Sequence, residues 1–225
     1  MNLQIVTSLV AALLGAAVGL FLPLGAQKLA LYKCKKKNRE LVEDSRFTGW
    51  LAKVPCALAN GIGWGLCWYF GAQVAVPAVL AAVIWSLGVI LILVDLRLRL
   101  IPNEVLLWML IVGVIMQVWV RGFGALFGCV FASMIVFCLF ATLGNFMGLY
   151  KIGAGDVKLA MVITMSLGYP TILTTLLGFS VSLLLFCVIG LLLKKITLKS
   201  YLPLGPFLVP GFWVGLIVLL NTAVV

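Results

Sequence analysis

The sequence predicts an all-α, polytopic membrane protein with about eight transmembrane helices. Of its 225 residues, 64% are hydrophobic and only 10% are charged, whereas soluble domains are about half apolar and a quarter charged. Apolar runs long enough to cross about 30 Å of hydrocarbon recur along the whole chain. Glycine is frequent, with 23 residues, as expected where membrane helices pack closely.

The predicted spans differ in length and in the charges that flank them. The first has no basic residue before it and a basic cluster after it, the reverse of a secretory signal peptide, so we expect it to be retained with the N-terminus outside. The second and sixth spans are short and rich in small residues. The expected ranges are residues 4–24, 55–71, 74–95, 104–120, 124–147, 156–169, 171–193 and 205–223.

The positive charges support this arrangement, because Lys and Arg gather in cytoplasmic loops. With both termini outside, Arg121 is the one basic residue of 16 that falls on the outer side. The net charge of +10 is therefore a topology signal, with some attraction to anionic membrane lipids. The long polar stretch from Lys28 to Pro55 is too short for a soluble basic domain, so we expect no nucleic-acid partner.

The cysteines do not form a metal-binding pattern. The six lie at positions 34, 56, 67, 129, 138 and 187, none in a CxxC pair, and the chain has no histidine. Tetrahedral zinc sites need closely spaced Cys or His ligands. We therefore expect the thiols to be small buried hydrophobic groups and expect no metal site. The composition excludes histidine-based catalysis.

Two acids stand where predicted spans meet the cytoplasmic side. Asp95 ends the third span in "VILILVDLRLRLIPNE", and Asp156 opens the sixth in "KIGAGDVKLA". Charged groups beside the bilayer core are costly, so acids kept there are candidates for a functional site. The structural alternative for Asp156 is an ordinary first-turn acid that complements the helix dipole. Because both lie at similar depth on different helices, the carboxylates are expected to come together.

Such a pair predicts aspartic-protease chemistry. Two partly desolvated carboxylates do not both ionise easily, so they share one proton. One carboxylate can act as general base on a water while the other protonates the substrate carbonyl oxygen, without histidine or metal. Gly153 and Gly155 precede Asp156 and would let another helix or an extended substrate backbone approach it.

Neighbouring residues have simpler expected roles. Pro102 and Asn103 predict the loop exit and N-cap of the fourth span, and Glu104 a dipole interaction in its first turn rather than a third catalytic acid. Lys158 follows Asp156 by two residues and should point away from it on a helix. A phosphate or lipid headgroup contact is its expected use.

These motifs resemble those of the type IV prepilin peptidases, membrane aspartic proteases of the GxGD class. In this sequence, Gly153, Gly155 and Asp156 match GxGD, and Lys158 matches its usual extension. The residue that matches the first catalytic aspartate is Asp95.

Two further motifs extend the resemblance. The IPN sequence that follows the first aspartate corresponds to Ile101, Pro102 and Asn103. A PxGP turn before the last span corresponds to Pro203, Gly205 and Pro206. These matches make residues 74–225 the expected membrane aspartyl peptidase core. Residues 1–73 are the expected N-terminal region, made of the first span, a short basic cytoplasmic loop and the second span.

The resemblance implies an intramembrane aspartic endopeptidase of the bacterial cytoplasmic membrane. Its substrates would be type IV prepilins or pseudopilins, cut after a glycine, between a basic leader and a hydrophobic helix, at the cytoplasmic face. The resemblance implies no cofactor for the peptidase reaction. Whether the substrates serve pili, secretion or DNA uptake is left open, as is the oligomeric state.

The loop after the first span departs from the family pattern. Many bacterial members carry two CxxC pairs there and methylate the new N-terminus with S-adenosylmethionine. Here Cys34 and Cys56 stand alone, so the zinc-bound subdomain is expected to be missing. Retention of the methyltransferase activity, with S-adenosylmethionine as its cofactor, is left open.

Two hypotheses accompany this interpretation. A proton- or cation-coupled transporter using Asp95 and Asp156 is the alternative function, because intramembrane acids also mark ion paths. Both acids lie at one face, however, and no pair of broken helices is visible in two matching halves. The second hypothesis concerns the substrate: charge complementarity would let acids of the cytoplasmic face bind the basic leader. These acids are Glu40, Glu43, Asp44 and Glu104.

Overall fold

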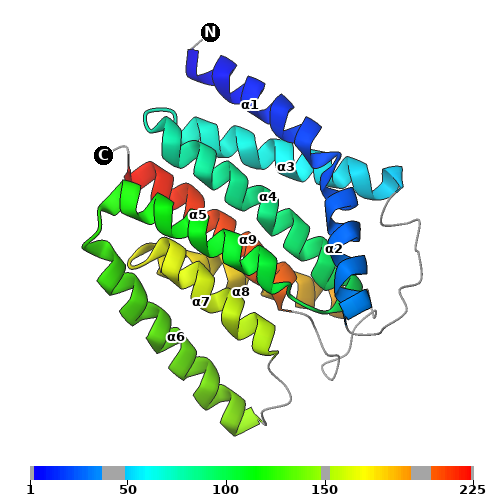
Figure 1. Cartoon of the computed structure of the whole chain (residues 1–225), viewed down its shortest axis with the longest axis vertical. Helices are drawn as coiled ribbons and strands as arrows, with labels where there is room; N and C mark the ends of the chain where they lie inside the picture. The colour runs from blue at the N-terminus through cyan, green and yellow to red at the C-terminus, as the bar shows by residue number, and fades with distance from the viewer. Residues whose placement is uncertain (1–2, 37–48, 148–152, 194–203, 224–225) are drawn as a thin grey trace.

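The computed structural model describes residues 3–36, 49–147, 153–193 and 204–223, and in these ranges it contains helices and no strand (Figure 1). The predicted all-α membrane fold is thereby confirmed. The helices are α1 (Leu3–Gly19), α2 (Leu22–Lys36), α3 (Trp50–Phe70), α4 (Ala75–Leu98), α5 (Asn103–Arg121), α6 (Ala125–Met147), α7 (Ala154–Leu167), α8 (Thr171–Leu192) and α9 (Gly205–Thr222).

Within the described ranges, six stretches are long and apolar enough to cross a membrane. They are Leu3–Lys36, Ala75–Leu98, Asn103–Arg121, Ala125–Thr142, Thr171–Leu192 and Gly205–Thr222. The predicted spans 55–71 and 156–169 form α3 and α7 but are not among the six. The 14 residues of α7 rise only about 21 Å, less than the hydrocarbon thickness of about 30 Å. The number of spans therefore stays a prediction.

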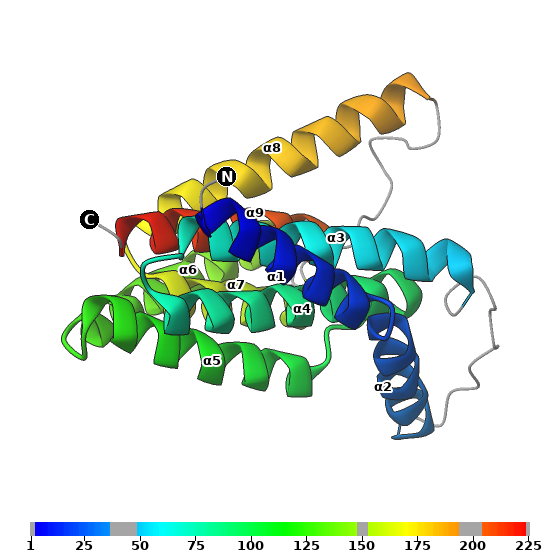
Figure 2. The same ribbon diagram turned by 90° about the horizontal axis from the view of Figure 1, so that it is seen from above.

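The first predicted span is wrong as one continuous helix over residues 4–24. α1 ends at Gly19, and a turn at Leu20 and Phe21 separates it from α2. Pro23 accounts for the break, because proline has no backbone N–H to bond the carbonyl of Gly19. After this turn, α2 leaves the direction of α1 and packs against α4 (Figures 1 and 2). The basic end of α2 thus comes close to the end of α4.

Small residues allow α1 and α3 to approach closely. A Cβ added at Gly19 would lie 2.6 Å from the Cα of Ala57, so only glycine fits there. The buried Asn60 of α3 donates a hydrogen bond to the carbonyl oxygen of Gly15 at 2.7 Å. Ser86 of α4 in turn donates to the Asn60 side-chain oxygen at 2.9 Å. This network connects α1, α3 and α4 with buried polar groups that are satisfied, as packing in lipid requires.

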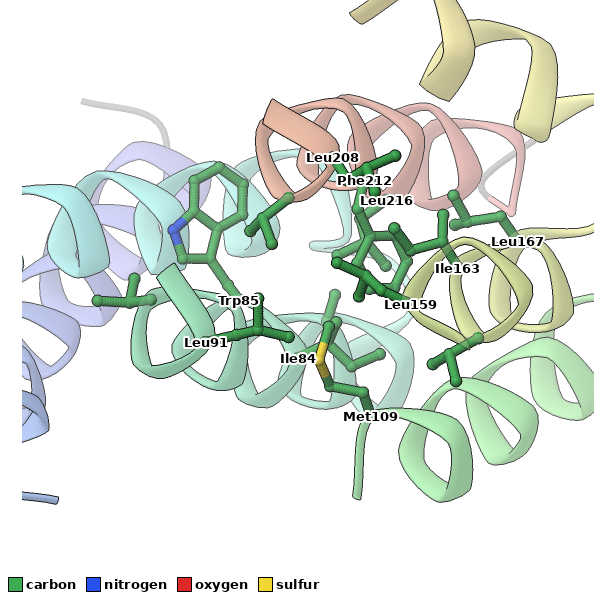
Figure 3. Close-up of a cluster of buried hydrophobic side chains, with 14 of the residues drawn as sticks. Ile84, Trp85, Leu91, Met109, Leu159, Ile163, Leu167, Leu208, Phe212 and Leu216 are labelled. Atoms are coloured by element: carbon green, nitrogen blue, oxygen red, sulfur yellow. The ribbon is translucent and has the colours of Figure 1, made fainter. Parts of the chain in front are cut away.

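The short helix α7 lies in the interior of the bundle. Leu159, Ile163 and Leu167 form one of its faces and are almost completely buried. Figure 3 shows this face directed toward Phe212 and Leu216 of α9, with side chains of α4 and α5 on the other side of the cluster. Other helices cover α7 from Leu159 onward, whereas its first turn, which carries Asp156, is only partly buried.

Arg121, the one basic residue expected on the outer side, has a structural role at the other end of α7. Its guanidinium Nη1 donates hydrogen bonds to the carbonyl oxygens of Leu167, at 3.0 Å, and Tyr169, at 2.8 Å. The last carbonyls of a helix lack partners within the helix and attract positive charge. Arg121 therefore caps α7 at the end opposite Asp156.

Replacing Arg121 with methionine is expected to lower the melting temperature of the detergent-purified protein. Two hydrogen bonds from a charged donor are lost, a cost of about 2–4 kcal/mol. Lys28→Met on the exposed part of α2 is the matched control and should leave the melting temperature unchanged. Scanning fluorimetry of both variants tests this, and equal melting temperatures for Arg121→Met and wild type would rule out the capping role.

Candidate active site

Asp95 lies on the inner side of α4, one turn before the helix ends. The helix runs to Leu98, one turn beyond the end predicted for the span. The side chain is only 4% exposed. Arg99, with a left-handed φ of 47°, ends the helix, and its N–H donates to the carbonyl oxygen of Asp95 at 2.7 Å. The chain then turns through Ile101 toward α5.

Asp156 lies in the first turn of α7, as predicted. Gly153 is in the N-cap position, and its carbonyl accepts a hydrogen bond from the Asp156 N–H at 2.9 Å. The carboxylate turns back over the helix start: a Cβ added at Gly153 would lie 2.8 Å from Asp156 Oδ2. Gly153 is therefore required for this position of the carboxylate. The position also complements the helix dipole.

Both aspartates line a single cavity of about 360 Å³. Asp95 comes from the last turns of α4 and Asp156 from the first turn of α7. The loop after α4, the start of α5, the start of α7 and the end of α2 form the walls. Besides the aspartates, the lining residues are Lys33, Arg99, Leu100, Ile101, Asn103, Gly153, Ala154, Gly155 and Lys158. The structure thus brings together the two acids that the sequence singled out.

Two glycines place the surrounding motifs against this pair. A Cβ at Gly205, the first residue of α9, would lie 2.6 Å from Asp95 Oδ2. A Cβ at Gly155 would lie 3.1 Å from the Cβ of Ile101. The close approach expected at Gly155 therefore involves Ile101 of this chain. GxGD packs on the IPN turn, and the glycine of PxGP packs on Asp95.

One oxygen of Asp95, Oδ2, is buried without a hydrogen-bond donor among the described residues. Leaving a buried carboxylate oxygen without a donor is unfavourable, which favours a shared proton or a bound polar substrate group at this atom.

The other predicted site residues have different surroundings. Pro102 occupies the N-cap position of α5, so the prediction of Asn103 as N-cap is wrong: Asn103 is the first helical residue, and no side chain caps this helix. Asn103 lines the cavity, whereas Pro102 is buried behind it. Pro206 lies in the first turn of α9, where proline is favoured. Pro203 lies outside the described residues.

Lys158 lies at the cavity without pairing with Asp156, its headgroup contact stays a prediction, and Glu104 has an additional partner. Lys158 lines the cavity and forms no ion pair with Asp156 within the described ranges. Glu104 is in the first turn of α5, as expected, and it pairs with Lys33 of α2. The Lys33 Nζ lies 2.6 Å from Oε2 and 2.7 Å from Oε1 of Glu104. No sequence pattern predicts this pair, because it depends on the turn that redirects α2.

The ion pair changes the hypothesis about leader binding. Glu104 already has a cationic partner inside the protein, which makes it a poor receptor for a basic peptide. Glu40, Glu43 and Asp44 lie outside the described residues, and their part of the hypothesis remains a prediction. The cavity itself is lined by the cationic residues Lys33, Arg99 and Lys158 as well as the two aspartates.

Replacing Lys33 with methionine is expected to lower kcat/KM about fivefold. The change removes the connection between α2 and α5 at the cavity wall and leaves Glu104 without its partner. A half-exposed ion pair contributes about 1 kcal/mol, and the same loss of transition-state stabilisation corresponds to about fivefold in kcat/KM. Lys35→Met on the exposed side of α2 is the control and should retain full activity, and Lys33→Arg should restore most of it. Steady-state cleavage kinetics test this; unchanged kcat/KM in Lys33→Met would exclude a positioning role.

The predicted burial of the cysteine thiols is confirmed for four of the six. These four, Cys34, Cys56, Cys67 and Cys129, are buried free thiols. The prediction of burial is wrong for Cys138, which is exposed on α6. A free thiol behaves as a small hydrophobic group, so it can lie on the outer surface of a membrane helix as well as in the core. In the ranges that the structure describes, no three Cys, Asp or Glu side chains gather at one point.

Comparison with known proteins gives a family. The model of the type IV leader peptidase family matches residues 81–193, about half of the chain. The match includes Asp95, the IPN turn and the GxGD motif, and it ends before Gly205. No curated protein sequence and no solved structure matches the chain. The protein is therefore a multi-pass membrane peptidase that belongs to the type IV leader peptidase family.

Proposed function

We propose that this protein is an intramembrane aspartic endopeptidase that removes the basic leader from type IV prepilins or pseudopilins. Asp95 and Asp156 are its catalytic residues in this proposal. The observation that carries it is the cavity that the two carboxylates share, from helices far apart in the sequence. Family membership supplies the general substrate class.

The proposed reaction begins with one proton shared by the two carboxylates. The ionised carboxylate takes a proton from water, whose oxygen attacks the carbonyl carbon of the substrate glycine. The protonated carboxyl group donates its proton to the carbonyl oxygen, giving a tetrahedral gem-diol. The first carboxyl group then protonates the amide nitrogen, the second takes a proton back from the diol, and the C–N bond breaks. The products are a leader with a terminal carboxyl group and a mature subunit with a free amine.

The small residues of the cavity wall support cleavage after glycine. Gly153, Ala154 and Gly155 line the cavity beside Asp156. A substrate residue without a side chain could lie flat against this wall and bring its carbonyl carbon close to both carboxylates. A substrate side chain at that position would take up part of a cavity of about 360 Å³ and hold the backbone away from this wall.

The distribution of charge supports a cytoplasmic active site in the proposed bacterial inner membrane. The cavity end of the bundle carries Lys33, Lys35 and Lys36 of α2 and Arg99 after α4. Arg121 lies at the opposite end of α5 from Asn103. Basic residues gather on the cytoplasmic side of membrane proteins, so the aspartates would act from that face.

A cleavage assay in detergent tests the substrate preference. The purified protein is incubated with a prepilin whose leader ends in glycine and with the same prepilin carrying leucine at that position. We expect a shortened product from the first only, with its new N-terminus, read by mass spectrometry, directly after the glycine. Equal cleavage of both substrates, or cleavage elsewhere, would contradict the proposed specificity.

N-methylation with S-adenosylmethionine remains a separate proposal that the same assay decides. Cys34 and Cys56 are separate buried thiols on α2 and α3, so the described residues do not fit a zinc-bound subdomain. A product heavier by one methyl group after addition of S-adenosylmethionine would establish the second activity, and an unchanged mass would limit the protein to cleavage.

A further inference from the structure

A second hollow lies next to the catalytic cavity, between α5, α6 and α7. It has a volume of about 520 Å³, and its walls are almost entirely apolar. Leu107 and Leu110 of α5 line it together with Val130 of α6 and Met161 and Met165 of α7. We call it the α5–α7 groove.

The groove and the catalytic cavity are neighbours that share two lining residues. Asn103, at the start of α5, and Lys158, near the start of α7, line both. These two polar residues lie at the end of the groove nearest the aspartates, since Asn103 opens α5 and Lys158 follows Asp156 by two residues. A chain whose scissile bond lies in the cavity would therefore enter the groove past Asn103 and Lys158.

The groove runs from the cavity end along α5 and α7. Met161 and Met165 follow Asp156 by five and nine residues along α7, which is about 8–14 Å at 1.5 Å per residue. On α5, Leu107 and Leu110 lie about 6–11 Å beyond Asn103 by the same measure. This depth matches about two turns of an α-helix.

The chemistry of the walls suits an apolar helix. Ser133 of α6 lines the groove, but its hydroxyl already donates to the carbonyl of Val130 at 2.8 Å, so it demands no polar partner. Methionine side chains adapt to different apolar surfaces, and Met161 and Met165 both face the groove. Beyond Asn103 and Lys158, the groove thus offers apolar contact along its length.

We infer that the α5–α7 groove binds the first two turns of the substrate's hydrophobic helix, directly after the scissile bond. This inference rests on the proposed function, because it takes a prepilin as the substrate. The groove holds the apolar segment while the bond before it lies between Asp95 and Asp156. The two lining residues that the groove shares with the cavity, Asn103 and Lys158, favour this occupant over a lipid chain. A substrate helix bound there is covalently joined to the peptide bond that lies at the aspartates.

Tryptophan substitutions on two walls of the groove test the inference. Leu107→Trp on α5 and Val130→Trp on α6 would fill part of the groove, and both positions are already exposed enough to accept a large side chain. The matched controls are Ile115→Trp on α5 and Met134→Trp on α6, which are similarly exposed and do not line the groove. We expect KM for the prepilin to rise about tenfold in the groove variants, with kcat changed less than twofold, and both constants to stay near wild type in the controls.

Photo-crosslinking identifies the occupant. A photoreactive amino acid is placed at Leu110 or, as the control, at Ile115, in the Asp156→Asn background, and the prepilin is added. We expect adducts from Leu110 to the residues directly after the scissile glycine, and none from Ile115. Wild-type KM in both groove variants, or adducts from Leu110 to lipid alone, would overturn the inference and leave the peptidase function standing. Failure of the wild-type protein to cleave any prepilin would instead remove the proposed function itself.

Discussion

Asparagine in place of either Asp95 or Asp156 is expected to lower kcat for prepilin cleavage by at least about 10³-fold. Asparagine keeps the shape of the side chain but neither takes up nor donates the proton that the reaction moves. The two carboxylates line one cavity, and the proposed reaction needs one as base and the other as acid. Neither should therefore replace the other. The expected loss is therefore the same for both variants, although they belong to helices α4 and α7.

The two asparagine variants should fold like the wild-type protein, so that lost activity reports on chemistry and not on structure. Removing a negative charge from the buried Asp95 should not destabilise the bundle, since burial of a charge is itself unfavourable. We expect wild-type expression, membrane insertion and melting temperature. A variant that folds normally and still cleaves would remove its aspartate from the mechanism.

Alanine in place of Gly205 is expected to lower kcat about 100-fold with little change in KM. The new Cβ would lie 2.6 Å from Asp95 Oδ2, 3.2 Å from its Cγ and 3.5 Å from Leu91 Cδ2. The carboxyl group must therefore move away from α9, and misplacement of a catalytic group by about 1 Å costs on the order of 10²-fold in rate. Steady-state kinetics on the purified variant measure the change.

Gly128→Ala on α6 is the matched control for this substitution. A Cβ at Gly128 meets nothing within 4 Å, so this variant should cleave like wild type. If Gly205→Ala also kept its kcat, the position of Asp95 would not depend on the packing of α9. The result would then limit the PxGP glycine to a role in the turn before α9.

The two aspartates could be predicted because they contrast with their surroundings. A carboxylate between apolar runs of membrane-span length is conspicuous in any sequence, and the costs of charge in lipid make it a candidate site. The helices themselves followed from the apolar runs in the same way. The glycines at 153, 155 and 205 were marked by their motifs, but their contacts with Asp156, Ile101 and Asp95 required the structure.

Features that depend on tertiary packing were missed. The turn before Pro23 separates α2 from α1 and brings Lys33 to Glu104, and no periodicity in the sequence indicates where α2 packs. The α5–α7 groove is also invisible in the sequence, because its apolar residues look like any others in a membrane helix. Its importance comes only from the two lining residues that it shares with the cavity, Asn103 and Lys158.

Two aspartates in one cavity of a membrane protein also fit ion transport, so the decisive measurement records both activities in one preparation. Wild-type protein and Asp156→Asn are reconstituted in liposomes that contain a pH-sensitive dye, with a prepilin inserted in the same bilayer. We predict a shortened prepilin in the wild-type liposomes only, with no proton or cation flux from either protein. A flux that disappears in Asp156→Asn, with the prepilin left intact throughout, would contradict the peptidase mechanism and make the aspartates an ion path.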